Sequence, residues 1–235
     1  MALMIFPVYE DCPFCDVDDP KFRAKEENTV LIETDNFVVV PTRGSFVAGY
    51  LLIVTKQHFI NFGQLPNRLF AEFRHIHHTA REHVRSSYGP VITFEHGGNG
   101  GFSDRGGSCI EHAHMHIVPY VNDPWELVES DYTCKRTDTQ TWPQHLKAHT
   151  GYIYLESDSA AARIYYASPD FPRQYLRRRL CARLGGELRD KWHYDLYPFE
   201  QKIAETVEKT AALRGHSPLK SVADTGPLFA AKSER

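Results

Sequence analysis

The segment Glu111–Val118 alternates histidine with small or apolar residues (EHAHMHIV). Successive side chains of a β-strand point to opposite faces of a sheet, whereas a helix repeats every three to four residues. A strand over 112–118 therefore places His112, His114 and His116 on one face and turns the residues between them toward a core. A surface strand that happens to carry histidines is the plain alternative. A row of imidazoles directly behind a glycine-rich loop favours a chemical site instead.

Further strands and one long helix are predicted around this segment. Apolar, β-branched segments at 29–33, 37–40, 50–54 and 91–95 are typical of strands. From Pro66 to Ser87 apolar residues recur at helical spacing, and Gly89-Pro90 ends the pattern. We therefore expect an α+β fold, in which an antiparallel meander of about five strands carries a long helix over one face.

The sequence changes character after residue 120. Turn-forming residues dominate 122–149, and apolar segments at 152–156 and 162–167 predict a second hairpin. Two helices are predicted at 173–184 and 199–213. We expect a domain over 1–120, a hairpin-and-helix extension over 121–216 packed on it, and a loosely ordered tail over 217–235.

Composition excludes several functional classes. The net charge of -3 argues against a broad electrostatic grip on extended nucleic acid. No apolar run approaches the roughly 20 residues that a membrane helix needs, and the N-terminus lacks the pattern of a signal peptide. The 5 cysteines are odd in number and sparse, which is typical of a reducing compartment. We expect a cytoplasmic protein without a membrane partner.

The alternating segment resembles the motif of the histidine triad (HIT) family, and HAHMHIV fits that motif at every position. The likeness extends over roughly residues 10–120 and includes the CxxC opening, the segment Ala48–His58 and the long helix. The stretches FEHG and SPDFPRQYLRRRLCARLG also resemble a bacterial subgroup of diadenosine-polyphosphate hydrolases.

The resemblance implies a covalent mechanism. His114 attacks the α-phosphorus of a nucleotide and forms a nucleotidyl-histidine intermediate. An imidazole suits this task because much of it is unprotonated near neutral pH. We expect a neighbouring carbonyl to accept the other ring proton and so fix the tautomer. His116 is expected to contact the phosphate or the leaving group.

Five further residues are candidates for holding the substrate. Ser103, Ser108 and the amides of the glycine-rich loop are expected to hold phosphate oxygens, because glycine lets the backbone approach closely. His96 borders this loop. The resemblance aligns Thr42 with the position where many members carry an acidic or amide ribose ligand, and it brings Gln174 to the site. Gln174 lies in the arginine-rich run 173–179, which otherwise suits a solvated helical face, and one of these arginines is the alternative to Gln174 at the site.

The pair Cys12 and Cys15 is compatible with metal binding, redox chemistry or simple burial. Bacterial proteins of the HIT family often bind zinc through such a pair, the histidine that closes the third strand and the first triad histidine. Those histidines correspond here to His58 and His112. Two thiolates and two imidazoles make a closed tetrahedral set that suits a structural zinc ion. His112 is then not available for catalysis.

The leading hypothesis is a hydrolase of a phosphoanhydride or related α-phosphate bond, with a nucleotide or dinucleoside polyphosphate as substrate. A phosphorylase or nucleotidyltransferase is an alternative, because the acceptor is not encoded in the triad. A non-catalytic, zinc-stabilised nucleotide-binding module is the alternative from another class. The resemblance also implies a homodimer, with the long helix and the last strands of the domain as the usual contact.

Overall fold

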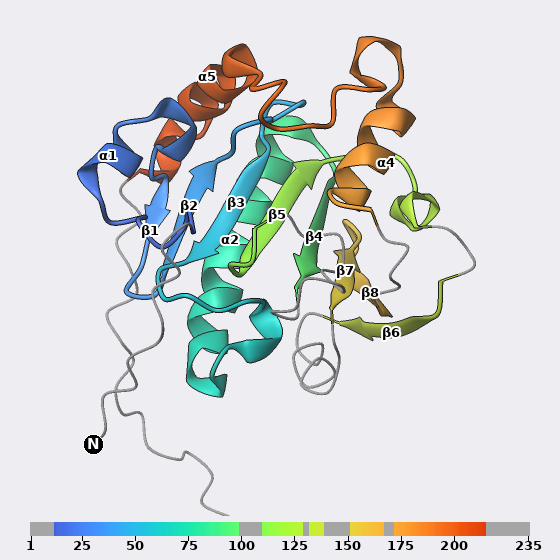
Figure 1. Ribbon diagram of the computed structural model, residues 1–235, viewed down its shortest axis with the longest axis horizontal. Coiled ribbons are helices and arrows are strands. Elements are labelled where there is room, and N and C mark those ends of the chain that lie inside the picture. Colours follow the sequence, from blue (N-terminus) through green and yellow to red (C-terminus); the bar gives the residue numbers. More distant parts are fainter. Residues whose placement is uncertain (1–11, 99–109, 129–131, 139–150, 167–171, 215–235) are drawn as a thin grey trace, which may run out of the picture.

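The computed structural model describes residues 12–98, 110–128, 132–138, 151–166 and 172–214. Its centre is one 8-stranded sheet with the strand order β1-β2-β3-β5-β4-β7-β8-β6 (Figure 1). All neighbouring strands pair antiparallel. The strands are β1 (Ile32–Glu33), β2 (Phe37–Pro41), β3 (Leu51–Thr55), β4 (Val91–Gly97), β5 (His114–Pro119), β6 (Cys134–Asp138), β7 (Tyr152–Glu156) and β8 (Ala161–Tyr166). The predicted α+β fold with an antiparallel sheet and a long helix is confirmed.

Four α-helices accompany the sheet in the described part of the chain: α1 (Pro20–Arg23), α2 (Phe70–Tyr88), α4 (Tyr175–Leu184) and α5 (Glu200–Lys209). Short 3-10 turns connect them at η1 (Glu26–Asn28), η2 (Phe62–Gln64), η3 (Asn67–Leu69), η4 (Pro124–Leu127), η5 (Gly186–Leu188) and η6 (Ala211–Leu213). None of the described helices is long and apolar enough to cross a membrane.

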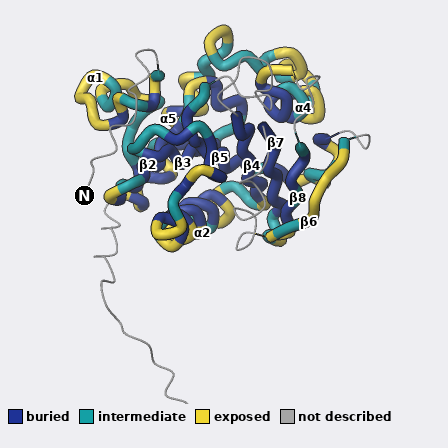
Figure 2. The backbone as a smooth tube through the Cα atoms, turned by 60° about the horizontal axis from the view of Figure 1, so that its bottom comes forward, coloured by how far each residue is buried: buried dark blue, intermediate teal, exposed yellow. Residues whose placement is uncertain are grey.

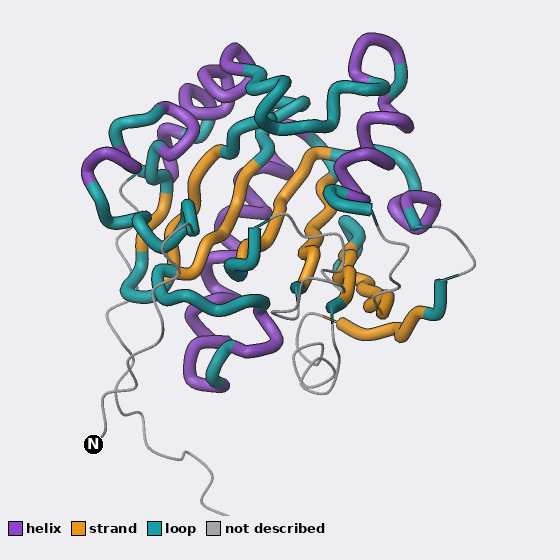
Figure 3. Tube along the Cα trace, in the orientation of Figure 1, coloured by secondary structure: helices purple, strands orange, loops and turns teal. Residues whose placement is uncertain are grey.

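The two faces of the sheet pack against different parts of the chain (Figures 2 and 3). Helix α2 covers one face, where Phe73 and Ile76 meet strand residues such as Ile53 and Met115. On the other face, strand residues such as Leu52 and Phe94 pack with the N-terminal segment and α4. Because both faces of the sheet are covered, the central strands β2, β3, β4 and β7 are buried throughout.

The last strand of the predicted domain differs from expectation in two respects. β5 begins at His114, and His112 lies before it in a bend, so only two of the three histidines share the face of a strand. The prediction that all three lie on one strand is therefore wrong. β5 also inserts between β3 and β4, so this part of the sheet is not a simple meander. Ala113, Met115 and Ile117 are fully buried in the core under α2, as predicted.

The extension continues the same sheet. The hairpin β7–β8 attaches through β7 to the free edge of β4, from Thr93 opposite Glu156 to Gly97 opposite Tyr152. β6 then adds an outer strand beside β8. The sequence did not predict β6, because its side chains are mostly exposed and show no apolar alternation. The edge of β4 is thus paired within the chain.

A second contact ties the extension to the loop between β2 and β3. The Gly44 amide donates to the Pro198 carbonyl at 3.0 Å, and a guanidinium nitrogen of Arg177 donates to the Gly44 carbonyl at 2.6 Å. Gly44 has φ +78, and a Cβ atom at this position would lie 2.6 Å from Cα of Tyr194. Glycine therefore permits both the backbone conformation and the close approach.

Gly44→Ala is expected to destabilise the protein through this contact. The left-handed backbone alone costs about 1–2 kcal/mol for an alanine, and the clash with Tyr194 adds about 1–3 kcal/mol. Gly186→Ala is the matched control, because Gly186 has φ +54 and a Cβ atom added there would meet nothing within 4 Å. Denaturant unfolding of both variants measures the difference. If both variants lose the same free energy of unfolding, the close contact with Tyr194 does not contribute to stability.

Candidate functional site

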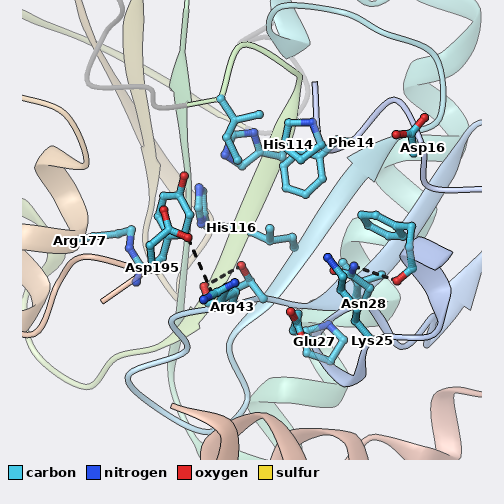
Figure 4. Close-up of a pocket in the computed structure, with 18 of the residues that line it drawn as sticks. Phe14, Asp16, Lys25, Glu27, Asn28, Arg43, His114, His116, Arg177 and Asp195 are labelled. Atoms are coloured by element: carbon cyan, nitrogen blue, oxygen red, sulfur yellow. Dashed lines mark hydrogen bonds and ion pairs between the residues drawn. The ribbon is translucent and has the colours of Figure 1, made fainter. Parts of the chain in front are cut away.

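A cavity of about 660 Å³ opens on the face of the sheet opposite α2 (Figure 4). Strand residues on its floor include Val40, Leu52, His96, His114 and His116. The N-terminal segment forms one arm, with residues that include Phe14, Phe22, Lys25 and Asn28. The extension forms the other arm with Gln174, Arg177, Tyr194 and Asp195. In Figure 4 His116 lies between the labelled residues of the two arms.

His114 is held in one tautomer by the backbone. Its Nδ1 atom lies 2.5 Å from the carbonyl oxygen of His112, so Nδ1 carries the proton and donates it to that carbonyl. The lone pair is then on Nε2. The ring is buried and packs against Phe14, with 5.3 Å between ring centroids. Burial lowers the pKa of His114, and the hydrogen bond to the His112 carbonyl opposes this shift. The arrangement favours a neutral ring whose Nε2 can act as a nucleophile.

Tyr50 allows His116 to adopt the opposite tautomer. The Tyr50 hydroxyl lies 2.7 Å from Nδ1 of His116, and burial raises the pKa of Tyr50 to about 12. The phenol therefore stays protonated and can donate to Nδ1, and in that tautomer the ring proton of His116 is on Nε2. Within the described residues Nε2 of His116 is buried and has no hydrogen-bond partner. His116 stacks on Phe94 at 4.3 Å between ring centroids and lines the cavity. In the tautomer with the proton on Nε2, it offers an unused N–H donor beside His114.

His96 on β4 completes a group of three imidazoles on the floor of the cavity. The backbone N–H of Leu176, in the first turn of α4, donates to Nε2 of His96 at 3.1 Å. Nε2 therefore carries no proton, and the ring is neutral with its proton on Nδ1. Burial, followed by the charges of His114 and Arg177, lowers the pKa of His96 to about 3. Through this hydrogen bond, His96 connects α4 of the extension to the floor of the cavity beside β5.

Arg177 brings a positive charge from α4 into the cavity. Its side chain is buried and donates to the carbonyls of Gly44 and Trp192 and to the Gln174 side chain. Its guanidinium lies 5.2 Å from the centre of the Phe46 ring. Gln174 itself has φ 58, an uncommon conformation for a residue other than glycine.

Cys12, Cys15, His58 and His112 form a separate cluster, in which the four donor atoms all lie within 4.8 Å of one another. Sγ of Cys12 lies 3.3 Å from Nδ1 of His112, and Sγ of Cys15 lies 3.2 Å from Nδ1 of His58. Nε2 of His112 donates to the Thr55 carbonyl at 2.7 Å, so its Nδ1 carries the lone pair that a metal ion needs. This cluster could hold a metal ion.

The structure brings most of the predicted residues together. Thr42, His96 and Gln174 line the same cavity as His114 and His116. The four predicted metal ligands form one cluster, and His112 is directed to it rather than to the cavity. Ser103 and Ser108 lie outside the described residues, so their contact with phosphate stays a prediction.

Sequence reasoning placed Gln174 or an arginine of 173–179 at the site without singling out Arg177, and it missed Tyr50. Arg177 lies in an arginine run, but Cys181 follows it by four residues, so the two share a helix face, and Cys181 is buried. This spacing distinguishes Arg177 from Arg178 and Arg179. Tyr50 precedes a buried strand, and no local pattern links it to His116.

Comparison with known proteins gives a family match for part of the chain. A family model of the HIT domain matches residues 23–122, which contain β1–β5 and α2. A histidine triad nucleotide-binding protein from Sulfolobus tokodaii is 22% identical with a TM-score of 0.36, over 48% of this chain and 71% of that chain. A HIT family hydrolase from Clostridium thermocellum is 21% identical with a TM-score of 0.36, over 49% of this chain and 95% of that chain. A yeast Ap4A phosphorylase in complex with AMP is 11% identical with a TM-score of 0.38, over 65% of this chain and 64% of that chain. No curated protein matches the chain.

Proposed function

We propose, from the premise that residues 23–122 form a HIT domain, that this protein is a nucleotide hydrolase in which His114 attacks the α-phosphorus. One observation carries the proposal. The His112 carbonyl accepts the Nδ1 proton of His114 at 2.5 Å, and this leaves Nε2 of a neutral imidazole as a nucleophile in the cavity. A protein that only binds nucleotides has no need of a nucleophile held in this way.

The reaction proceeds in two displacements. Nε2 of His114 forms a bond to phosphorus while the bond to the leaving oxygen breaks, and the leaving group departs with that electron pair. A water oxygen then attacks phosphorus, the N–P bond breaks and His114 regains its lone pair, while the water proton passes to solvent. Nε2–H of His116 is placed to donate to a phosphate oxygen, because its other nitrogen is occupied by Tyr50. Such a donor stabilises negative charge that develops at phosphorus.

The N-terminal arm has the character of a nucleoside site. Phe22, Val40 and Leu52 supply apolar surface for a base, and Asn28 and Thr42 supply polar groups at the same cavity. Ligand sites combine apolar walls with a few polar side chains in this way. Thr42 is a weaker ribose ligand than a carboxylate, and a contact with the ribose does not distinguish one base from another.

The metal cluster is proposed to hold a structural zinc ion. Zn–S bonds of about 2.3 Å and Zn–N bonds of about 2.0–2.1 Å in a tetrahedron place sulfur and nitrogen about 3.5 Å apart. The corresponding separations are 3.3 and 3.2 Å, with 3.9 Å between Cys15 and His112. Four protein ligands leave no position for a reacting water, so the ion would brace the N-terminal segment. Unpaired thiols also persist in a reducing compartment, and we therefore expect the protein to be cytoplasmic.

The homodimer that the resemblance implies cannot form through the edge of β4. This strand pairs with β5 on one side and with β7 on the other, so it offers no free edge. The exposed side of α2 remains open to such a contact.

A substrate panel tests the proposed function. Dinucleoside polyphosphates, a nucleoside phosphoramidate and nucleoside diphosphate sugars are incubated with and without inorganic phosphate, and products are identified by mass. A hydrolase yields nucleoside monophosphate whether or not phosphate is present. Formation of a nucleoside diphosphate that depends on phosphate would show the phosphorylase instead. Binding without any turnover across the panel would favour the non-catalytic module.

A further inference from the structure

Arg177 is a buried cation without a carboxylate partner in the part of the chain that the structure describes. Only 5% of its surface is exposed. The groups it contacts are neutral: the Gly44 carbonyl at 2.6 Å, the Trp192 carbonyl at 3.1 Å and the Gln174 side-chain oxygen at 3.2 Å. A buried charge that no opposite charge offsets is costly. An anionic group bound beside Arg177 would remove that cost.

Other donors converge on the same arm of the cavity. Arg177 and Gln174 line it together with His96 and His116. Nε2 of His116 is a buried nitrogen without a hydrogen-bond partner among the described residues, and it is a donor when Tyr50 donates to Nδ1. A guanidinium and a free imidazole N–H are groups that bind phosphate in proteins.

One carboxylate lies in this arm. Asp195 is half exposed, and Arg43 lies 3.8 Å from it. This pair compensates its own charge at the exposed end of the arm (Figure 4). The net charge that remains toward the triad is the positive charge of Arg177.

The protonation states of the histidines on the floor of the cavity also favour an anionic ligand. His96 accepts from the Leu176 amide and His116 is bonded to the Tyr50 hydroxyl, so neither ring has a carboxylate partner among the described residues that would stabilise an imidazolium acid. Burial and the nearby charge of Arg177 both lower the pKa values of His96 and His116. An amine leaving group needs a proton from an acid, whereas a phosphate departs as an anion. The site is therefore suited to a leaving group that carries its own negative charge.

We propose that the C-terminal arm is a second anion subsite, in which Arg177 binds the phosphate group on the far side of the bond that His114 breaks. This inference rests on the proposed function, because it places the leaving group opposite the nucleoside arm. It names the substrate class as a nucleotide whose α-phosphorus is joined to a further phosphate. An incoming inorganic phosphate would use the same subsite in the reverse direction.

The test compares two leaving groups in the variant Arg177→Gln. The substrates are diadenosine tetraphosphate, with a phosphate leaving group, and adenosine 5′-(p-nitrophenyl phosphate), with a phenolate that departs unprotonated. We expect kcat/KM to fall about 10²-fold for the tetraphosphate and less than about threefold for the p-nitrophenyl ester. Arg178→Gln is the control, since Arg178 lies next to Arg177 but stacks on Trp192 at 3.5 Å. It should match the wild type on both substrates.

The outcomes separate the two proposals. Equal losses on both substrates would mean that Arg177 only holds the fold, and would overturn the subsite while leaving the proposed function intact. Wild-type protein that turns over neither substrate would overturn the proposed function itself. If Arg177→Gln does not fold, Arg177→Lys replaces it, with a smaller loss still confined to the tetraphosphate; a loss on both substrates would again overturn the subsite.

Free phosphate provides a second measurement. Inorganic phosphate should inhibit hydrolysis of the p-nitrophenyl ester in the wild type, and at least about tenfold less strongly in Arg177→Gln. Formation of adenosine diphosphate in its presence would show that the subsite accepts an incoming phosphate. Equal effects of phosphate on the wild type and the variant would contradict the subsite.

Discussion

Replacing His114 with alanine is expected to lower kcat by at least about 10⁴-fold, because no other group replaces a covalent nucleophile. Nucleotide affinity should change less than about fivefold, since the two arms of the cavity supply most of the contacts. His114 packs against Phe14 and is not in the core under α2, so the variant should fold. Steady-state turnover and equilibrium binding of the product nucleotide measure the two effects separately.

His78→Ala is the control for this variant, because His78 is an exposed histidine on the opposite side of the sheet. It should leave both turnover and binding unchanged. His114→Ala with more than a tenth of wild-type turnover would contradict a covalent role for this residue. Loss of binding together with turnover would instead indicate a damaged cavity.

Cys12→Ser is expected to release the metal ion and to destabilise the N-terminal segment. Metal binding to such clusters contributes directly to the free energy of folding. A loss of about 4 kcal/mol corresponds to a decrease in Tm of roughly 8–16 °C for a chain of this size. The same segment carries Phe14 against His114 and lines the cavity, so KM should rise as well. Elemental analysis and thermal unfolding measure the two main effects.

Cys134→Ser is the matched control, because Cys134 is an exposed free cysteine on β6 outside the cluster. This variant should keep one metal ion per chain and the wild-type Tm. Wild-type protein purified without chelator and free of zinc would contradict the proposed ion. Full zinc content in Cys12→Ser would contradict the proposed ligand set.

The strand alternation and the helical spacing predicted the elements that carry the domain. Both patterns arise from burial of one face against a core, and this is why Met115 and Ile76 meet as expected. The predicted hairpin of the extension is also present as β7 and β8. Its attachment to β4 was not predictable, because strand pairing across more than fifty residues leaves no local signal.

The candidate site was predictable where its residues share a motif and not where distant segments meet. The triad motif correctly identified His114 and His116 as residues that line the cavity. The alternation of the sequence, however, wrongly predicted that His112 lies on the same strand. In the structure His112 turns toward Cys12 and Thr55 instead. The arm formed by the extension depends on side chains on the buried face of α4. The sequence does not show which face is buried, because a run of arginines hides the apolar spacing.

The most direct test of the central claim is a search for the covalent intermediate. Wild-type protein is mixed with a substrate, quenched within milliseconds in alkaline denaturant and digested, and the peptides are analysed by mass. We predict a peptide containing His114 that gains the mass of one nucleotidyl group, and no such peptide in His114→Ala. A wild type that turns over substrate without labelling His114, or that labels another residue, would contradict the account.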